Sequence, residues 1–176
     1  MGRGRAAGPW HRPRSRLTLA GFPRTSTFAP KPPVHHASAE SVTTHRVNYS
    51  ETDQMGVVYH ARHVVWLDIA RCEHLRRAGY TYRELEAEGI RLVVTDLRVR
   101  YRQAARYDDE LRIRCRVTEA ASRRVTFAYL IEQAESGAVV AEAETTLVCL
   151  DARHRVCRLP AGVVDALRPN PGPEPR

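Results

Sequence analysis

The stretch YSETDQMGVVYHARHVVWLDIAR, residues 49–71, contains the change from an extended segment to a helix. Asp53 is followed three residues later by Gly56, and the helical pattern starts near Tyr59 and His60. Because glycine tolerates positive φ, the segment DQMG predicts a tight turn. Such a turn returns the Asp53 carboxylate toward the N-terminus of the following helix.

The first N–H groups of that helix are suited to polarising a carbonyl, because they lack internal acceptors and carry the positive end of the helix dipole. They are expected at Tyr59, His60 and Ala61. With Asp53 they would supply a base or nucleophile and an oxyanion hole, the minimum set for acyl transfer. The spacing alone favours a plainer alternative, in which Asp53 accepts a local backbone hydrogen bond and Gly56 only closes a turn.

The segment around this junction predicts a strand followed by two helices. Residues 43–49 are expected to form a short strand. The apolar residues between Ala61 and Ala78 cover more than one stripe, so this helix is expected to be largely buried. Gly79 ends it, and a shorter helix in TYRELEAEG ends at Gly89 in the same way.

Beyond Gly89 the apolar period changes to two, which predicts strands. LRIRCRV, residues 111–117, alternates throughout, and β-branched residues enrich three further segments: RLVVTDLRVRYR, RRVTFAYLIEQ and AVVAEAETTLVCLDAR. One strand, one buried helix and four long antiparallel strands predict an α+β fold, in which a sheet curls around a single helix.

The charge is concentrated near the start of the chain. Seven of the 28 basic residues but only one of the 20 acidic residues precede residue 41, so most of the formal net charge of +8 belongs to that segment. Residues 1–40 are expected to be a disordered basic leader, either an organelle transit peptide or an extended start. Residues 41–168 form the expected single domain, and residues 169–176 a flexible Pro-rich tail.

The same distribution bears on partners and location. A basic leader without a basic and aromatic stripe in the folded part does not predict nucleic-acid binding. No apolar run reaches the roughly 18 residues of a membrane span, so a membrane partner is not expected. We expect a cytoplasmic protein, or a plastid or mitochondrial one if the leader is a transit peptide.

The four cysteines show no CxxC pairing, which is typical of reduced thiols in an intracellular protein. Neither a metal nor a disulfide is predicted. His60 and His63 lie one helical turn apart but lack a zinc-site spacing, which favours a structural or pocket-lining role. The sequence also contains no serine-hydrolase elbow, phosphate-binding loop or dinucleotide fingerprint.

Several strings of the chain resemble one family. TDQMGVVYH, WLDIAR, LRRAG, YRELEAEGI and ARYDDELRI are similar to segments of the hotdog-fold acyl-CoA thioesterases of the 4-hydroxybenzoyl-CoA thioesterase type. The resemblance implies that Asp53 is the catalytic carboxylate and that the backbone N–H of His60 polarises the thioester carbonyl. Tyr59 would lie beside His60 and help to line the acyl pocket. The resemblance also places four residues in the substrate pocket: Gly56, Val57, Val58 and His63.

The resemblance extends to coenzyme A and to assembly. Arg123 and Arg124 in SRRVTF match basic residues that hold its phosphates, although an ordinary solvated hairpin fits this pair as well. No cofactor is implied, since coenzyme A is part of the substrate, and the acyl group could also be carried by an acyl carrier protein. The segment RLVVTDL lacks an obvious charged residue of the kind that keeps an edge strand from pairing with another chain. This agrees with a homodimer or homotetramer.

Some alternatives remain open at this stage. Asp53 could attack the thioester directly or activate a water. The helix carboxylates Asp68 and Glu73 have structural explanations, as partners of Arg71 and Arg77 respectively. A non-catalytic acyl-binding protein or a hydratase or dehydratase of the same fold are the rival functions.

Overall fold

The computed structural model describes residues 40–169, so the predicted leader, apart from Glu40, and the predicted tail, apart from Pro169, lie outside the described residues. No helix within residues 40–169 is long and apolar enough to cross a membrane. The elements are β1 (Ser41–Arg46), a 3₁₀ turn η1 (Tyr49–Glu51), α1 (Arg62–Arg77), α2 (Tyr82–Ala87), β2 (Arg91–Tyr101), β3 (Glu110–Ala120), β4 (Arg124–Gln133), β5 (Val139–Leu150) and α3 (Ala161–Ala166).

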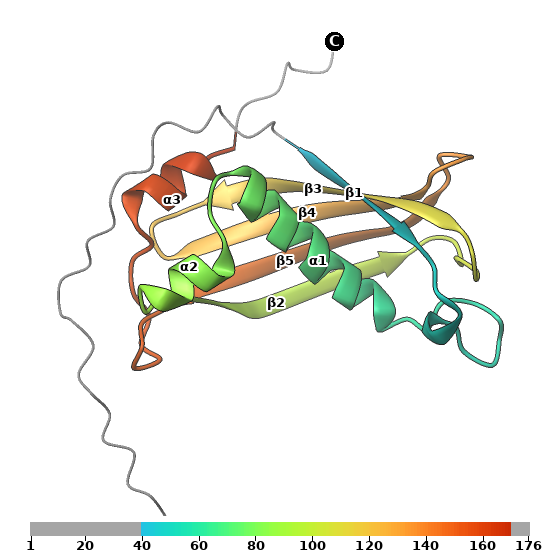
Figure 1. The fold of residues 1–176 in the computed structure, drawn as a ribbon, viewed down its shortest axis with the longest axis horizontal. Helices are drawn as coiled ribbons and strands as arrows, with labels where there is room; N and C mark the ends of the chain where they lie inside the picture. The colour runs from blue at the N-terminus through green and yellow to red at the C-terminus, as the bar shows by residue number, and fades with distance from the viewer. Residues whose placement is uncertain (1–39, 170–176) are drawn as a thin grey trace, which may run out of the picture.

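The strands form one five-stranded sheet in the order β1-β3-β4-β5-β2, and all four pairings are antiparallel. Helix α1 lies across one face of the sheet, and α2 and α3 lie near one end of it (Figure 1). The predicted α+β architecture is therefore confirmed. The two edges of the sheet are β1, which precedes α1 and α2, and β2, which follows them.

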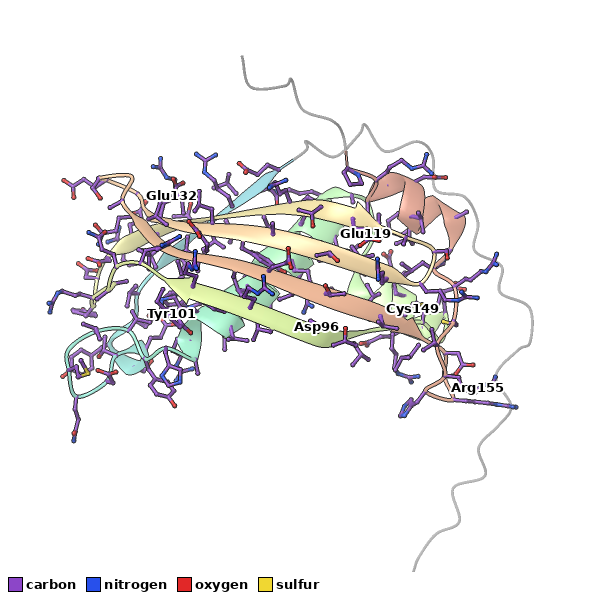
Figure 2. The ribbon with its side chains drawn as sticks, turned by 180° about the vertical axis from the view of Figure 1, so that it is seen from behind. Asp96, Tyr101, Glu119, Glu132, Cys149 and Arg155 are labelled. Carbon is purple, nitrogen blue, oxygen red and sulfur yellow. The ribbon has the colours of Figure 1, made fainter. Side chains whose placement is uncertain are left out.

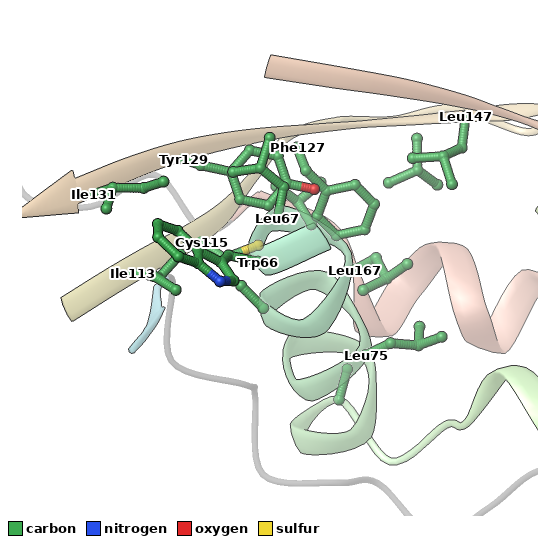
Figure 3. Close-up of a cluster of buried hydrophobic side chains, with 14 of the residues drawn as sticks. Trp66, Leu67, Leu75, Ile113, Cys115, Phe127, Tyr129, Ile131, Leu147 and Leu167 are labelled. Carbon is green, nitrogen blue, oxygen red and sulfur yellow. The ribbon is translucent and has the colours of Figure 1, made fainter. Parts of the chain in front are cut away.

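Helix α1 agrees with the predicted residues 61–78 to within one residue at each end. It ends before Gly79, whose φ of 86° is accessible to glycine without strain. Trp66, Leu67 and Leu75 from α1 are almost completely buried. Figure 3 shows them in one cluster with Ile113, Cys115, Phe127, Tyr129 and Leu147 of the sheet. This contact between α1 and the sheet is the core.

The prediction that α1 is largely buried is wrong for one face of the helix. Val64, Val65 and Ile69 are 37%, 48% and 43% exposed. Val64 and Val65 line a groove between α1 and the β2 side of the sheet, which no other element of the described chain fills. Apolar spacing identifies such a face but does not tell whether the chain itself or another molecule buries it.

The first strand begins two residues before the predicted start and ends three residues before the predicted end. It ends at Arg46, and Tyr49, expected in the strand, begins the 3₁₀ turn instead. The reason is a capping box, in which the Asn48 N–H donates to the Glu51 carboxylate at 2.8 Å. This local hydrogen bond closes a turn that the strand propensity of Tyr49 and Val47 does not reveal.

Candidate active site

The segment from Glu51 to Tyr59 forms a closed loop before α1. Asp53 donates its N–H to Val57 at 2.9 Å, Thr52 bridges to Val58, and the Tyr59 N–H donates to the Glu51 carbonyl at 2.9 Å. Gly56 has a φ of 70°, so the predicted glycine turn is confirmed. Val57 is half-buried and Val58 buried, so the loop is anchored to the fold by its second half.

Asp53 is half-buried within this loop. Its Oδ1 accepts the Met55 N–H at 2.8 Å, which is the turn hydrogen bond of the plainer interpretation. The Oδ2 atom has no hydrogen bond among residues 40–169. A carboxylate offers several acceptor positions, so the turn role leaves one oxygen of Asp53 free for chemistry.

Several backbone N–H groups at the start of α1 lack an acceptor within residues 40–169. Those of His60 and Ala61 have no acceptor among the described residues, as the prediction requires. The prediction is wrong for Tyr59, because its N–H is already bonded to Glu51 across the loop. The Tyr59 carbonyl in turn accepts the Arg62 N–H at 2.9 Å. That bond fixes the plane of the peptide that carries the His60 N–H.

The next peptide, which joins His60 to Ala61, is fixed by hydrogen bonds to its carbonyl oxygen. The His60 carbonyl accepts from the Tyr101 hydroxyl at 3.0 Å and from Nδ1 of His63 at 3.1 Å. Tyr101 is the last residue of β2, and Figure 2 shows it toward the end of the sheet beside the loop. A peptide whose carbonyl is bonded twice keeps its N–H, here that of Ala61, in a fixed direction.

His63 is buried, and its Nε2 has no hydrogen-bond partner in the described part of the chain. Burial lowers the pKa of His63, despite the hydrogen bond to the His60 carbonyl that favours its charged form. Its ring is therefore neutral at pH 7, with Nδ1 donating and Nε2 bearing a lone pair. His63 thus lies in the first turn of α1, close in sequence to the free amides, and it does not line the groove described below, so its predicted pocket role stays a prediction.

Glu51 is the first residue of the loop before α1, and its carboxylate accepts hydrogen bonds from three residues. Its carboxylate accepts from Trp66 Nε1 at 2.8 Å, from His45 Nε2 at 2.9 Å and from the Asn48 N–H at 2.8 Å. Burial alone would raise the pKa of Glu51, but these hydrogen bonds together hold the pKa below its usual value. The carboxylate therefore ties β1, the loop and α1 together at one point.

Replacing Glu51 with glutamine is expected to lower the free energy of unfolding at pH 7 by about 1–3 kcal/mol, because an amide has one oxygen where three donors converge. The folded-state pKa of Glu51 is depressed, so its stabilisation is complete above the unfolded value of about 4.3 and is lost as the pH falls through the folded value. The difference between wild type and Glu51→Gln in urea unfolding should thus shrink only in acid. A difference that is the same at pH 7 and pH 3 would contradict this role.

A groove of about 290 Å³ runs between α1 and the β2 side of the sheet. Its apolar lining consists of Val64, Val65, Leu67, Val94 and Leu97. Asp68 and Arg71 also line it, and they form an ion pair with each other, as the sequence suggested. Neither Asp53 nor His60 lines this groove, which begins about one helical turn beyond the free amides.

The predicted phosphate-binding arginines lie far from the loop within one chain. Arg124 pairs through β5 with Val93 of β2, eight residues before Tyr101, which places it roughly 25 Å along the sheet from the His60 carbonyl. Arg124 also forms an ion pair with Glu119 at 2.8 Å. Arg123 is exposed in the same turn. The structure therefore does not bring these residues together with Asp53 in a single chain.

The structure also bears on the helix carboxylate Glu73 and on the question of a metal site. Glu73 pairs with Arg76 rather than with the predicted Arg77. Within residues 40–169 there is no cluster of three or more His, Cys, Asp or Glu side chains that could hold a metal ion. Sequence reasoning did not single out Glu51 or Tyr101. Glu51 has a signal in the N-x-x-E capping pattern, whereas the contact of Tyr101 with His60 spans 41 positions and has none.

Comparison with known proteins identifies relatives over most of the described chain. A model of the thioesterase-like superfamily matches residues 47–167. An acyl-CoA thioester hydrolase named YbgC from Escherichia coli O6:H1 is 39% identical over 106 residues, which cover 60% of this chain and 78% of the relative.

Solved structures agree with these sequence relatives. A DHNA-CoA thioesterase from Staphylococcus aureus has a TM-score of 0.66 and 30% identity, covering 68% of this chain and 80% of the other. A 4-hydroxybenzoyl CoA thioesterase has a TM-score of 0.68 at 18% identity, covering 74% and 99% of the two chains. The latter likeness is one of fold, and it confirms the predicted hotdog architecture.

Proposed function

Since the chain belongs to the thioesterase-like superfamily, we propose that it hydrolyses an acyl-CoA thioester at the loop between β1 and α1. Its relatives carry the names of acyl-CoA thioester hydrolases, so the chain is an enzyme of the thioester hydrolase class. An acyl carrier protein thioester is the second candidate substrate, because it presents the same reactive group.

One observation carries the proposed site: a carboxylate with a free oxygen lies in the closed loop, and the free N–H groups of His60 and Ala61 directly follow that loop at the start of α1. Asp53 is bonded to Val57, which precedes His60 by three residues, so at most about 10 Å of backbone separates this pair from His60. An aspartate side chain and a thioester group can together span such a gap. The positive end of the α1 dipole adds to the pull on a carbonyl oxygen bound there.

The proposed reaction uses these groups in sequence. The thioester oxygen accepts the His60 N–H, which stabilises the negative charge that develops on it. Asp53 then either attacks the carbonyl carbon, forming a mixed anhydride that water cleaves, or removes a proton from an attacking water. In both routes the carbon–sulfur bond breaks, the thiol leaves with one proton, and the acid leaves with the oxygen of water.

Tyr101 is proposed to position, through its bond to the His60 carbonyl, the peptide that carries the Ala61 N–H, which would assist the His60 N–H in binding the thioester oxygen. Changing Tyr101 to phenylalanine removes one of two donors, and His63 keeps the other. We therefore expect kcat for thioester hydrolysis to fall about 3- to 10-fold, the worth of one ordinary hydrogen bond. The matched control is Tyr107→Phe, since Tyr107 is exposed and its hydroxyl has no partner among the described residues. Equal kcat values for Tyr101→Phe and wild type would exclude the positioning role.

The proposed assembly pairs two copies along β2. This edge strand spans 11 residues, against six for β1, and its Val94, Leu97 and Tyr101 are between 45% and 47% exposed beside the open face of α1. A second copy would bury both surfaces and close the groove between α1 and β2. Antiparallel pairing of two β2 strands also brings opposite ends of the two sheets together. That arrangement supports a phosphate role for Arg123 and Arg124 of one copy at the loop of the other.

The test is an assay of the full chain with short, long and aromatic acyl-CoAs and with an acyl carrier protein thioester, following release of free thiol. The expected result is thiol release from at least one acyl-CoA. Binding of acyl-CoA without thiol release would favour the acyl-binding alternative. Formation of a hydroxyacyl thioester from an unsaturated one would instead favour a hydratase.

A further inference from the structure

Two of the four cysteines lie against each other at the end of the sheet opposite the proposed site. The Sγ atoms of Cys149 in β5 and Cys157 in the following segment are 3.0 Å apart, and both are free thiols. Cys149 pairs with Leu92 of β2, nine residues before Tyr101, so roughly 30 Å of sheet separates it from the His60 loop. Figure 2 shows Tyr101 and Cys149 toward opposite ends.

The backbone holds the two cysteines in register. The Cys157 N–H donates to the Cys149 carbonyl at 2.9 Å, and the neighbouring residues Leu150 and Val156 form an antiparallel bridge. Cys149 and Cys157 are thus directly opposed residues of a short antiparallel pair. Such residues have Cα atoms about 4.5–5.5 Å apart, which lies within the range that a disulfide spans. Closing a bond of about 2.05 Å requires the sulfurs to approach by about 1 Å.

The two thiols differ in their surroundings. Cys149 is buried, and burial raises its pKa to about 12, whereas Cys157 is half-buried. An oxidant therefore reaches Cys157 first, since Cys157 is the more accessible of the two sulfurs. Cys149 is then next to the oxidised sulfur. The other cysteines, Cys72 and Cys115, have no sulfur neighbour within residues 40–169.

From this arrangement we infer that Cys149 and Cys157 form an oxidation site that closes into an intrachain disulfide on reaction with a hydroperoxide. The Cys157 thiolate attacks the peroxide, the O–O bond breaks, and a sulfenic acid and hydroxide form. The Cys149 sulfur then attacks the sulfenic sulfur, an S–S bond forms, and water leaves. Overall the two thiols lose two electrons and two protons, and hydrogen peroxide is reduced to two waters.

The disulfide would link the segment after β5, which leads into α3, covalently to the sheet. After Cys157 the chain buries Leu159, Val163 and Leu167, and the Leu159 N–H donates to the Ser122 carbonyl at 2.8 Å. Helix α3 in this segment lies near the end of the sheet where β5 finishes (Figure 1). A cross-link here restricts a short loop of the unfolded chain and so raises the midpoint of thermal unfolding.

The test treats the full-length reduced protein with hydrogen peroxide and maps its peptides by mass spectrometry, without alkylation and after reduction. The expected product is an intrachain Cys149–Cys157 link that lacks two hydrogens and that dithiothreitol reverses. The midpoint of thermal unfolding should rise by about 5–10 °C on oxidation. Cys157→Ser should abolish both changes, and Cys72→Ser should retain both.

Other results would overturn the inference. They are four free thiols after peroxide treatment, a link that joins other cysteines or two chains, or an unfolding shift that persists in Cys157→Ser. Because Cys157 is half-buried, its change to serine is mild, and the midpoint of the reduced variant checks that it folds. These measurements involve no thioester, so their failure and the failure of the proposed hydrolase activity are distinguishable.

Discussion

Changing Asp53 to asparagine is expected to lower kcat for thioester hydrolysis by about 10²- to 10⁴-fold, the usual contribution of a positioned base or nucleophile. The amide cannot take a proton from water and is a poor nucleophile, so both proposed routes fail. The fold should persist, because the Asn side chain keeps the oxygen that accepts the Met55 N–H. Steady-state thiol release and thermal unfolding of the same preparation separate the two effects.

The chain supplies a matched control for this change. Asp151 accepts the Arg153 N–H at 2.8 Å, the same two-residue turn bond that Asp53 accepts from Met55, but in a loop near the opposite end of the sheet. Unlike Asp53 it also forms an ion pair with Arg155 at 2.9 Å, so the unfolding midpoint of this control is measured too. Asp151→Asn should leave kcat unchanged. If Asp53→Asn also leaves kcat unchanged, Asp53 is only a turn residue and the plainer interpretation of the sequence holds. If kcat and the unfolding midpoint fall together, the loss is one of structure.

Local signals explain what could be predicted from the sequence. The limits of α1 follow from apolar spacing and from Gly79, and the turn before it follows from Gly56. The free amides follow from the position of the helix start, since any helix leaves its first N–H groups without internal acceptors. These features depend on residues within one or two turns of each other.

The features that sequence reasoning missed depend on distant residues. Glu51 bonds Trp66, which is 15 positions away, and Tyr101 bonds the His60 carbonyl over 41 positions. Tyr59 loses its free N–H to Glu51 only because the loop closes on itself. The open face of α1 has a different cause. Val64, Val65 and Ile69 are apolar, but whether the same chain covers them depends on the sheet order, which places β2 at an edge.

The exposed apolar face of α1 and the neighbouring edge strand β2 lead to the second prediction with a large expected effect. Changing Leu97 to arginine is expected to convert a dimer to a monomer and to reduce thioester hydrolysis at least about 100-fold, if two copies pair along β2. Leu97 is 45% exposed in the single chain, so an arginine there can extend into water and the monomer should still fold. In a paired assembly two such charges would be buried, one from each copy, without partners. Light scattering measures the mass, and thiol release measures the activity.

The control places the same charge on the other edge of the sheet. Val42 of β1 is 36% exposed, and its side chain has a size close to that of Leu97. If copies associate along β2, Val42→Arg should remain a dimer and keep its activity, whereas Leu97→Arg should lose both. The reverse pattern would place the interface at β1 and leave the groove between α1 and β2 open. A Leu97→Arg monomer with full activity would show that one chain contains the complete site, because then no residue of a second copy is needed for hydrolysis.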